Sequence, residues 1–441
     1  MQGISMEKKA KFKISLSNIF YTFMIIAVSI ICVGGASPYP HAIRFPLIIA
    51  TAILSAGFII FKQQKIYLNM PVVLLLLTVA YLFISVTYSV DSKNTMELAI
   101  VYLCSTVITL ADFKLDFYKK ALTAMKVVCI VIAFSIIVSS FVDDCMIKYF
   151  SFIVNPTHNS ELTRLIHQEI SWSKSYSGFA KEKGEAAFIM NVGIAIYYAK
   201  YFSEKKFKIS DIFFLAILFW ALILANKRML FICPIAVLLF LLIFSTKKGR
   251  LIKMFPFIFI AVCALIMAVG TIPQITYLFE RFSNSDSMES LSGRVNIWPY
   301  SLEMFGKNPL FGMGIGSFNK YLSTQGITIN GDEWSFYGHN VYYEFLGELG
   351  IVGCLLLFGA LIMIFVKTTT LMIDKNISSF EKYLLTFSFA IQLTCFIYSA
   401  SGNVLLYKQQ IFIWFFASAI ALTISRKYRK STKTVKELAY A

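Results

Sequence analysis

Charged residues are scarce in this sequence of 441 residues, of which they make up 15%, against about 25% in an ordinary soluble domain. Hydrophobic residues account for 58% of the chain, and the mean hydropathy is +0.70. A fold in water could not bury this much apolar surface, so the composition excludes a soluble globular domain and predicts an integral membrane protein. The 42 phenylalanines and 23 tyrosines suit rings that face lipid and the membrane interface.

Several chemical signatures are also missing. The eight cysteines include no Cys-x-x-Cys pair, so neither a zinc site nor a disulfide framework is predicted. The absence of a Walker motif argues against an ATP-driven pump. The predicted cytoplasmic loops contain no Asp-x-Asp pair, which argues against a metal-bound nucleotide-sugar donor. We therefore expect no metal and no cofactor.

The net charge of +17 does not indicate a nucleic-acid partner, because the basic residues fall in short clusters between apolar runs. A helix needs about 20 apolar residues to cross the hydrocarbon core of a membrane. Such runs predict an all-α integral membrane protein with about twelve transmembrane helices in one polytopic domain, 1–441. The runs are 17–36, 43–61, 71–89, 96–111, 122–141, 184–202, 211–226, 228–245, 254–276, 350–367, 383–400 and 405–424. The first run lacks a convincing cleavage site and is predicted to be a retained helix rather than a signal peptide.

Every second loop is basic, beginning with the N-terminal segment and ending with the C-terminal tail. Cytoplasmic loops carry an excess of Lys and Arg, so both termini are predicted to be cytoplasmic. Two long loops, 142–183 and 277–349, then lie on the outer side of the membrane. Loops of this length in a compact protein usually have a function. We expect the loop 277–349, between the ninth and tenth helices, to carry the catalytic motif.

Three short motifs stand out in or near these outer regions. The loop 277–349 contains an Arg-x3-Trp pair, Arg294 and Trp298, followed by Pro-Leu-x-Gly-x-Gly with Gly314 at its end. His339-Asn340, nine further residues and Gly-x-x-Gly lead into the tenth helix. The third motif is a basic pair, Lys227-Arg228, in the tight turn between the seventh and eighth helices.

These motifs resemble the O-antigen ligase/polymerase superfamily of bacterial surface-polysaccharide enzymes. The resemblance is specific over about 290–355 and rests elsewhere on topology. It implies a fold similar to that of C-type glycosyltransferases, with the long extracytoplasmic loop between helices 9 and 10. It also implies a polyprenyl-pyrophosphate-linked glycan as substrate, and Arg228, Arg294 and His339 as the matching functional positions. Many members have Ser where this chain has Lys227, so the alignment of Arg228 is the weakest of the three.

The residue types suit this chemistry. The planar guanidinium groups of Arg228 and Arg294 can bind phosphate oxygens bidentately, and Lys227 adds a further positive charge. The alternatives are a contact with lipid headgroups for Arg228 and a solvated loop position for Arg294. His339 is one of only four histidines. A neutral imidazole can accept the proton of an attacking hydroxyl, although a lone histidine is more often structural.

The other predicted substrate-binding residues lie around these positions. Trp298 is costly to leave in water, which favours a structured segment. Glu344 and Glu348 are one helical turn apart and follow Asn340 closely, so they could reach the site or lie on a solvated face. The alternating glycines around Gly314 indicate a tight turn or a close backbone approach, and are weak evidence for a phosphate site.

The sequence thus predicts a metal-independent glycosyltransferase in the bacterial inner membrane, with its active site on the outer face. It would move a glycan from undecaprenyl pyrophosphate to a sugar hydroxyl, and a repeat-unit polymerase is the slightly preferred interpretation. A ligase that uses lipid A core as acceptor is the close alternative, and a related branch glycosylates proteins. A transporter or flippase is the alternative from another class, but the chain has no internal repeat. The expected partners are the lipid-linked oligosaccharide, the glycan or lipid A core acceptor and membrane lipids.

Overall fold

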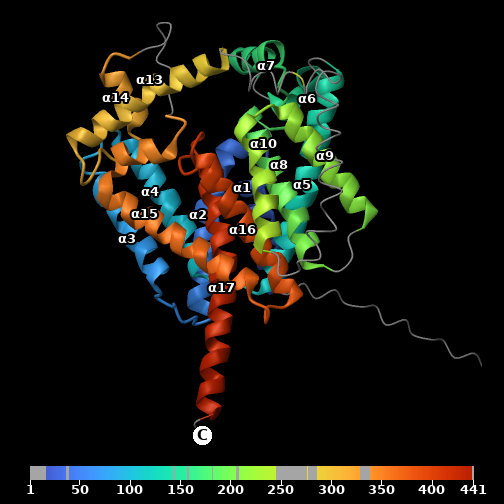
Figure 1. Cartoon of the computed structure of the whole chain (residues 1–441), viewed down its shortest axis with the longest axis vertical. Helices are drawn as coiled ribbons and strands as arrows, with labels where there is room; N and C mark the ends of the chain where they lie inside the picture. Colours follow the sequence, from blue (N-terminus) through green and yellow to red (C-terminus); the bar gives the residue numbers. More distant parts are fainter. Residues whose placement is uncertain are drawn as a thin grey trace, which may run out of the picture.

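The computed structural model describes residues 16–35, 39–142, 145–155, 158–180, 182–204, 208–244, 276, 286–327 and 338–439. The regular elements in these ranges are all helices, and most of them run side by side in one bundle (Figure 1). The bundle helices are α1 (Leu16–Val33), α2 (Tyr39–Phe61), α3 (Met70–Ser85), α4 (Ser92–Leu110), α5 (Leu115–Phe141), α8 (Lys183–Ser203), α9 (Ile209–Ala225), α10 (Arg228–Phe244), α15 (Val341–Ile373), α16 (Ser379–Ser399) and α17 (Lys408–Ala439).

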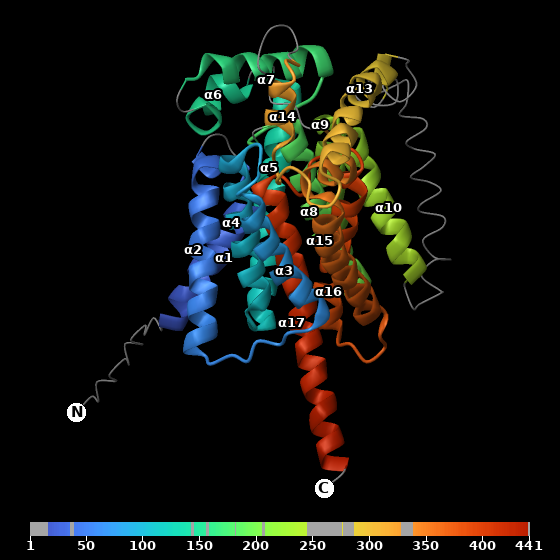
Figure 2. The same ribbon diagram turned by 90° about the vertical axis from the view of Figure 1, so that its left-hand side faces the viewer.

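Four further helices cover one end of the bundle. They are α6 (Cys145–Val154), α7 (Ser160–Ser173), α13 (Asp286–Lys307) and α14 (Phe318–Thr324). We call this the capped end (Figure 2). The predicted loop 142–183 thus contains α6 and α7, and the predicted loop 277–349 contains α13, α14 and the first residues of α15.

Each predicted apolar run within the described residues overlaps a bundle helix, and the run 254–276 lies outside them except for its last residue. Four of the described helices are long and apolar enough to cross a membrane: Ile43–Phe61, Leu115–Phe141, Val341–Ile373 and Lys408–Arg429. Several of the other helices are apolar but shorter. An all-helical fold with four candidate membrane spans is therefore confirmed for the described residues, whereas the count of twelve crossings and the placement of the loops stay predictions.

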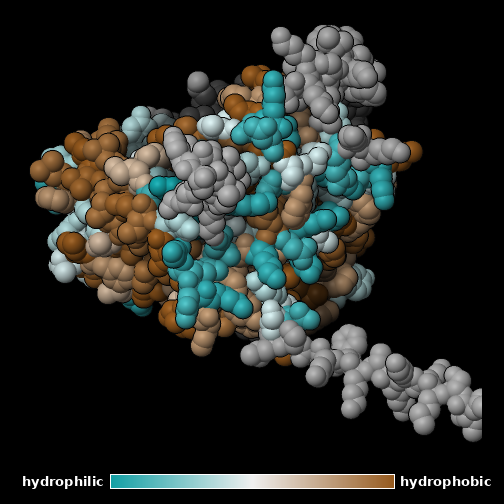
Figure 3. All heavy atoms as spheres, turned by 90° about the horizontal axis from the view of Figure 1, so that it is seen from below, coloured by the Kyte–Doolittle hydropathy of each residue, from teal (hydrophilic) through white to brown (hydrophobic). Residues whose placement is uncertain are grey.

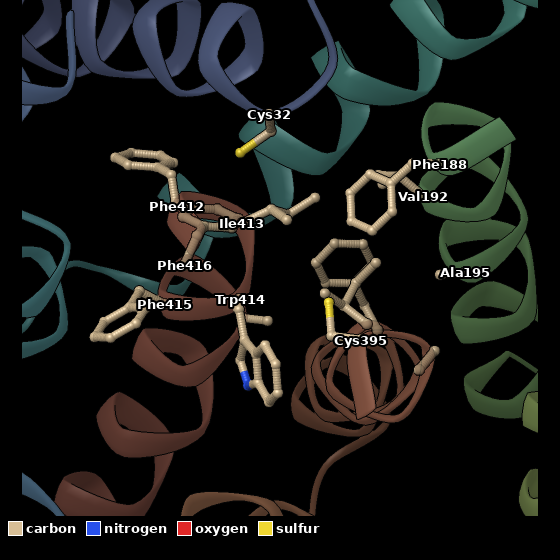
Figure 4. Close-up of a cluster of buried hydrophobic side chains, with 14 of the residues drawn as sticks. Cys32, Phe188, Val192, Ala195, Cys395, Phe412, Ile413, Trp414, Phe415 and Phe416 are labelled. Atoms are coloured by element: carbon tan, nitrogen blue, oxygen red, sulfur yellow. The ribbon is translucent and has the colours of Figure 1, made fainter. Parts of the chain in front are cut away.

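The helix α17 is the central element of the bundle. Of its most apolar window, 83% is buried inside the protein, against 28% for the window in α2. A helix that is buried on all sides must be surrounded by other helices. Figure 4 shows residues 412–416 of α17 pointing to different sides of the helix, within the buried cluster that also contains Cys32 of α1, Phe188 of α8 and Cys395 of α16.

The first helix, α1, begins on the side of the bundle opposite the capped end, and the last helix, α17, finishes on that same side (Figure 2). Hydrophilic side chains gather on this face, whereas hydrophobic ones dominate one flank of the bundle (Figure 3). The basic connections after α2, α4 and α15 all lie at this end. This arrangement agrees with the alternation seen along the sequence, but which side of the membrane each end faces stays a prediction.

Candidate active site

The segment that leads into α15 is fixed by its own side chains. The amide oxygen of Asn340 accepts hydrogen bonds from the backbone N–H groups of Tyr342 (3.1 Å) and Tyr343 (3.3 Å), so Asn340 caps the helix. His339 precedes this cap with a φ of +50°, in the left-handed region, and its side chain is half-buried. Histidine adopts this conformation more readily than most residues. The cap therefore holds the imidazole at a defined place at the capped end.

Trp298 connects this segment to α13 through two contacts. The indole Nε1–H of Trp298 donates to the carbonyl oxygen of Gly338 at 2.8 Å, and its ring lies 5.3 Å from that of Tyr343. The carboxylate of Glu344, which is 1% exposed, accepts from the N–H of Gly338 at 3.1 Å. Arg294 lies one helical turn before Trp298, and its side chain is outside the described residues. The backbone position of Arg294 is thus tied to the residue next to His339.

The helix α15 is interrupted at Gly350, whose φ of +61° and ψ of −172° are not helical. Such a break removes backbone hydrogen bonds that the helix would otherwise make. The freed N–H groups of Ile351 and Val352 donate instead to the carbonyls of Pro309 (2.9 Å) and Leu310 (3.1 Å). These two carbonyls belong to residues 309–317, which we call the glycine loop.

The glycine loop and α3 also supply donors to the carbonyls before the break. The N–H of Met313 donates to the carbonyl of Gly347 at 3.1 Å. The hydroxyl of Tyr81, on α3, lies 2.6 Å from the carbonyl oxygen of Leu349. The interruption therefore exchanges hydrogen bonds within the helix for bonds to the glycine loop and to α3, as buried backbone groups require.

The other face of the glycine loop contacts the first turn of α4 and the residues just before it. The side chain of Asn94 donates to the carbonyl of Gly316 at 2.7 Å, and the hydroxyl of Thr95 donates to that of Ile315 at 2.7 Å. Gly314 has a φ of +93°, and a Cβ added there would lie 2.3 Å from the hydroxyl of Ser89. The tight turn indicated by the alternating glycines is confirmed, and its close neighbour is another part of the protein.

Glu348 is fully buried and holds the start of α14. Its Oε2 accepts from the N–H of Gly316 at 2.8 Å and its Oε1 from the N–H of Phe318 at 2.9 Å. Both carboxylate oxygens thus bind backbone groups of the protein. The substrate contact predicted for Glu348 stays a prediction, and a structural role has the more direct support.

Substituting Glu348→Gln should lower the stability of the folded protein by about 1–3 kcal/mol, because the amide would present N–H groups to buried backbone donors. The thermal unfolding midpoint in detergent is the measurement. Glu303→Gln is the control, since the carboxylate of Glu303 pairs with Lys307 at 2.8 Å on an exposed part of α13. An equal midpoint for both variants would contradict the structural role.

The exposed pair on α13 also contacts α14. The hydroxyl of Tyr321 donates to Glu303 at 2.7 Å and accepts from the ammonium of Lys307 at 2.6 Å. The hydrogen bonds from Lys307 and Tyr321 lower the pKa of Glu303, and the same carboxylate raises the pKa of Lys307. Beneath them, Phe318 and Met304 belong to a small separate hydrophobic cluster. The helices α13 and α14 therefore pack as one unit above the bundle.

The basic pair predicted from the sequence lies in the turn between α9 and α10. Asn226 ends α9 in the left-handed conformation, with a φ of 51° and a ψ of 43°. Lys227 follows it, and Arg228 is the first residue of α10; both side chains are half-buried. A Cβ added at Gly184 would lie 3.4 Å from Cε of Lys227, so this turn packs closely against the start of α8.

A buried ion pair lies one residue further along α8. Arg44 of α2 pairs with Glu185, and the two side chains are only 4% and 6% exposed. The guanidinium also donates to the carbonyl of Gly34, just after α1, at 2.6 Å. Arg44 was not among the residues predicted from the sequence. The signal that points to it is an isolated arginine at the start of an otherwise apolar run, 43–61.

The helix α16 lies between the two groups of predicted residues. From α10, the thiol of Cys233 contacts the carbonyl of Thr394 at 3.9 Å. From α15, the hydroxyl of Tyr342 donates to the carbonyl of Phe396 at 2.8 Å. The start of α10 and the segment before α15 therefore both lie at the capped end, on helices that contact one stretch of α16 (Figure 2).

Residues 213–358 match the family model described as O-antigen ligase. The match spans Arg228, Arg294 and His339, and it confirms the resemblance to the O-antigen ligase/polymerase superfamily. It supports glycosyl transfer of the O-antigen ligase/polymerase type in the assembly of surface polysaccharide. No curated protein matches the chain.

Proposed function

We propose that the protein is a metal-independent glycosyltransferase that moves a glycan from undecaprenyl pyrophosphate to a sugar hydroxyl. The observation that carries the proposal is the family match over 213–358, which includes every residue that we assign to the reaction. The link from Trp298 to the backbone next to His339 supports a shared site for Arg294 and His339. The burial of Glu344 beside them favours a preorganised pocket over a solvated loop.

In the proposed step, the hydroxyl oxygen of the acceptor attacks the anomeric carbon of the donor sugar. The bond from that carbon to the pyrophosphate oxygen breaks, and the leaving undecaprenyl pyrophosphate takes the electron pair. The imidazole of His339 accepts the proton of the hydroxyl. Attack in line with the leaving group inverts the configuration at the anomeric carbon.

Arg228 and Arg294 are assigned to the charge that develops on the leaving pyrophosphate. Cations that are already in place stabilise such charge with little reorganisation. The guanidinium fork suits phosphate oxygens, and Lys227 adds a further positive charge beside Arg228. Trp298, Asn340, Glu344, Glu348 and Gly314 are proposed to contact the glycan or to shape the site around it.

We further propose that the capped end faces the outside of the bacterial inner membrane and that both termini are cytoplasmic. The basic connections at the opposite end of the bundle support this orientation. Lipid-linked glycans exposed at the outer leaflet would then reach the site directly from the membrane. The acceptor would approach from the side of α13 and α14.

Polymerisation of repeat units is our first choice of reaction, with a second lipid-linked repeat unit as the acceptor. Ligation to lipid A core is the second candidate, and the description of the matched family favours it. The two reactions share the donor and the chemistry and differ in the acceptor alone.

The test uses the purified full chain in liposomes with a fluorescent lipid-linked repeat unit. A ladder of products on a gel indicates a polymerase, whereas a single shifted product that forms only with lipid A core indicates a ligase. Arg228→Ala and Arg294→Ala should abolish either product. Movement of the lipid-linked unit across the bilayer, with no new glycosidic bond, would refute the transferase and favour a flippase.

A further inference from the structure

The short helix α6 carries large apolar side chains on a face that no described part of the chain covers. Tyr149 is 66% exposed and Phe152 is 67% exposed. The opposite face is buried, and there Met146 and Val154 form a small hydrophobic cluster with Ile166 of α7. The inner face of α6 therefore packs on the protein, and its outer face is aromatic and exposed.

The helix α6 follows closely along the chain after α5, which has an exposed apolar stripe of its own. The exposed residues of this stripe are three or four positions apart, so they share one side of the helix. They are Val127, Val131, Phe134, Val138 and Phe141. The last of them, Phe141, is 79% exposed and lies at the end of α5, just before α6. In an apolar helix of a membrane protein, such a stripe faces lipid.

The length of α5 sets the depth of α6. Lys120 forms an exposed ion pair with Asp116 at 2.8 Å, which places this part of α5 in the water-facing layer at one side of the membrane. At 1.5 Å per residue, the distance from Lys120 to Phe141 is about 32 Å. The hydrocarbon core of a bilayer is about 30 Å thick. Phe141 therefore reaches the opposite boundary of the core, and α6 begins at the level of the lipid headgroups.

The neighbouring helix α7 differs from α6 in the character of its exposed face. Among the side chains of α7 that the structure describes, the exposed ones recur at three- and four-residue spacing and are polar: Ser160, Arg164, His167 and Ser171. The contrast between two adjacent helices of the same cap shows that exposure alone does not account for the aromatic face of α6.

We propose that α6 is an interfacial helix whose Tyr149 and Phe152 insert into the bilayer surface at the capped end, together with Phe141. Aromatic side chains favour this layer because one part of it is apolar and the other is wet. Lys148 is also exposed and can reach the phosphate groups of the lipids. The partner is the phospholipid surface, because α6 begins where the lipid-facing stripe of α5 reaches the boundary of the hydrocarbon core.

A short chain of contacts connects α6 to the α9–α10 turn. The ring of Phe150, on α6, packs edge-on against Phe179 at 5.3 Å. The N–H of Phe179 donates to the hydroxyl of Ser135, on α5, at 2.9 Å. Close by in the chain, the N–H of Tyr176 donates to the carbonyl of Leu224 at 3.0 Å, near the end of α9. When α6 is inserted in the bilayer surface, it therefore supports the segment with Tyr176 and Phe179, which packs near this turn.

The test places a nitroxide label on the full chain in phospholipid nanodiscs, at Tyr149→Cys and Phe152→Cys in separate variants. Arg164→Cys and Ser171→Cys, on the polar face of α7, are the matched controls. The native cysteines of the described residues are buried or half-buried, and labelled parent protein measures their contribution. All four substitutions are at exposed positions, and thermal unfolding midpoints equal to that of the parent verify the fold.

The measured quantity is the collision rate of each label with oxygen, which concentrates in lipid, and with a water-soluble nickel chelate. At positions 149 and 152, the ratio of the oxygen collision rate to the nickel collision rate should be at least about threefold higher than at the α7 controls. Nickel accessibility equal to that of the controls would overturn the proposal. Exclusion of both reagents would also overturn it, because a protein partner would then cover the face.

Discussion

Replacing His339 with asparagine will slow glycan transfer by about 10²–10⁴-fold, the usual contribution of a positioned general base. Asparagine is the informative substitution because it tolerates the left-handed backbone that His339 adopts, with its φ of +50°. The cap formed by Asn340 and the contact of Trp298 with Gly338 should therefore survive. The rate at saturating donor and acceptor, with purified variants in liposomes, is the measurement.

His158→Asn is a closely matched control for this experiment. His158 also has a φ of +50°, is exposed, and lies between α6 and α7 at the same end of the molecule. The change of residue type and of backbone setting is thus the same, and the control should retain the parent rate. A His339→Asn variant within about threefold of the parent would show that the imidazole does not accept the proton in the step that limits the rate.

Replacing Gly350 with alanine will destabilise the protein by about 3–5 kcal/mol, at the upper end of single substitutions. The backbone at Gly350, with a φ of +61° and a ψ of −172°, is in a region that is essentially restricted to glycine. An added Cβ would also lie 2.5 Å from the carbonyl oxygen of Leu310 and 2.6 Å from the nitrogen of Gly312. Both are backbone atoms, so no side chain can move aside.

Gly306→Ala separates this effect from the general effect of removing a glycine. Gly306 lies in α13, and an added Cβ would have no atom within 4 Å. Alanine there should leave stability unchanged or raise it by about 0.5–1 kcal/mol, the usual gain in a helix. The thermal unfolding midpoint and the yield of monodisperse protein in detergent report both variants. Equal midpoints for the two would show that the glycine loop does not hold the break in α15.

The helices of the bundle could be predicted from the sequence because lipid imposes long apolar runs on any helix that faces it. The start of α15 was predicted less well. The apolar run begins at 350, whereas the helix begins at Val341. Hydropathy misses the first turns because they contain Glu344 and Glu348, whose carboxylates are buried against backbone N–H groups, of nearby Gly338 and of distant Gly316 respectively. Burial by such partners depends on tertiary contacts and leaves no periodic signal.

The candidate site could be predicted only in part. The motifs singled out His339 and Asn340, and the structure brings them next to Trp298 and Glu344. The turn at Gly314 was also expected, but its neighbour, Ser89, could not be foreseen because it is 225 positions away in the chain. The ion pair of Arg44 and Glu185 escaped prediction because neither residue belongs to a recognisable spacing.

The break in α15 has a consequence for how the chain is made. The partners described for the backbone around Gly350 are Tyr81, on α3, and residues of the glycine loop. All of them precede Gly350 in the sequence, and segments made first generally fold first during synthesis. When the ribosome releases the interrupted stretch, its acceptors and donors have already been synthesised. The helix can then be completed at once, with no interval in which its unsatisfied backbone would have to face lipid.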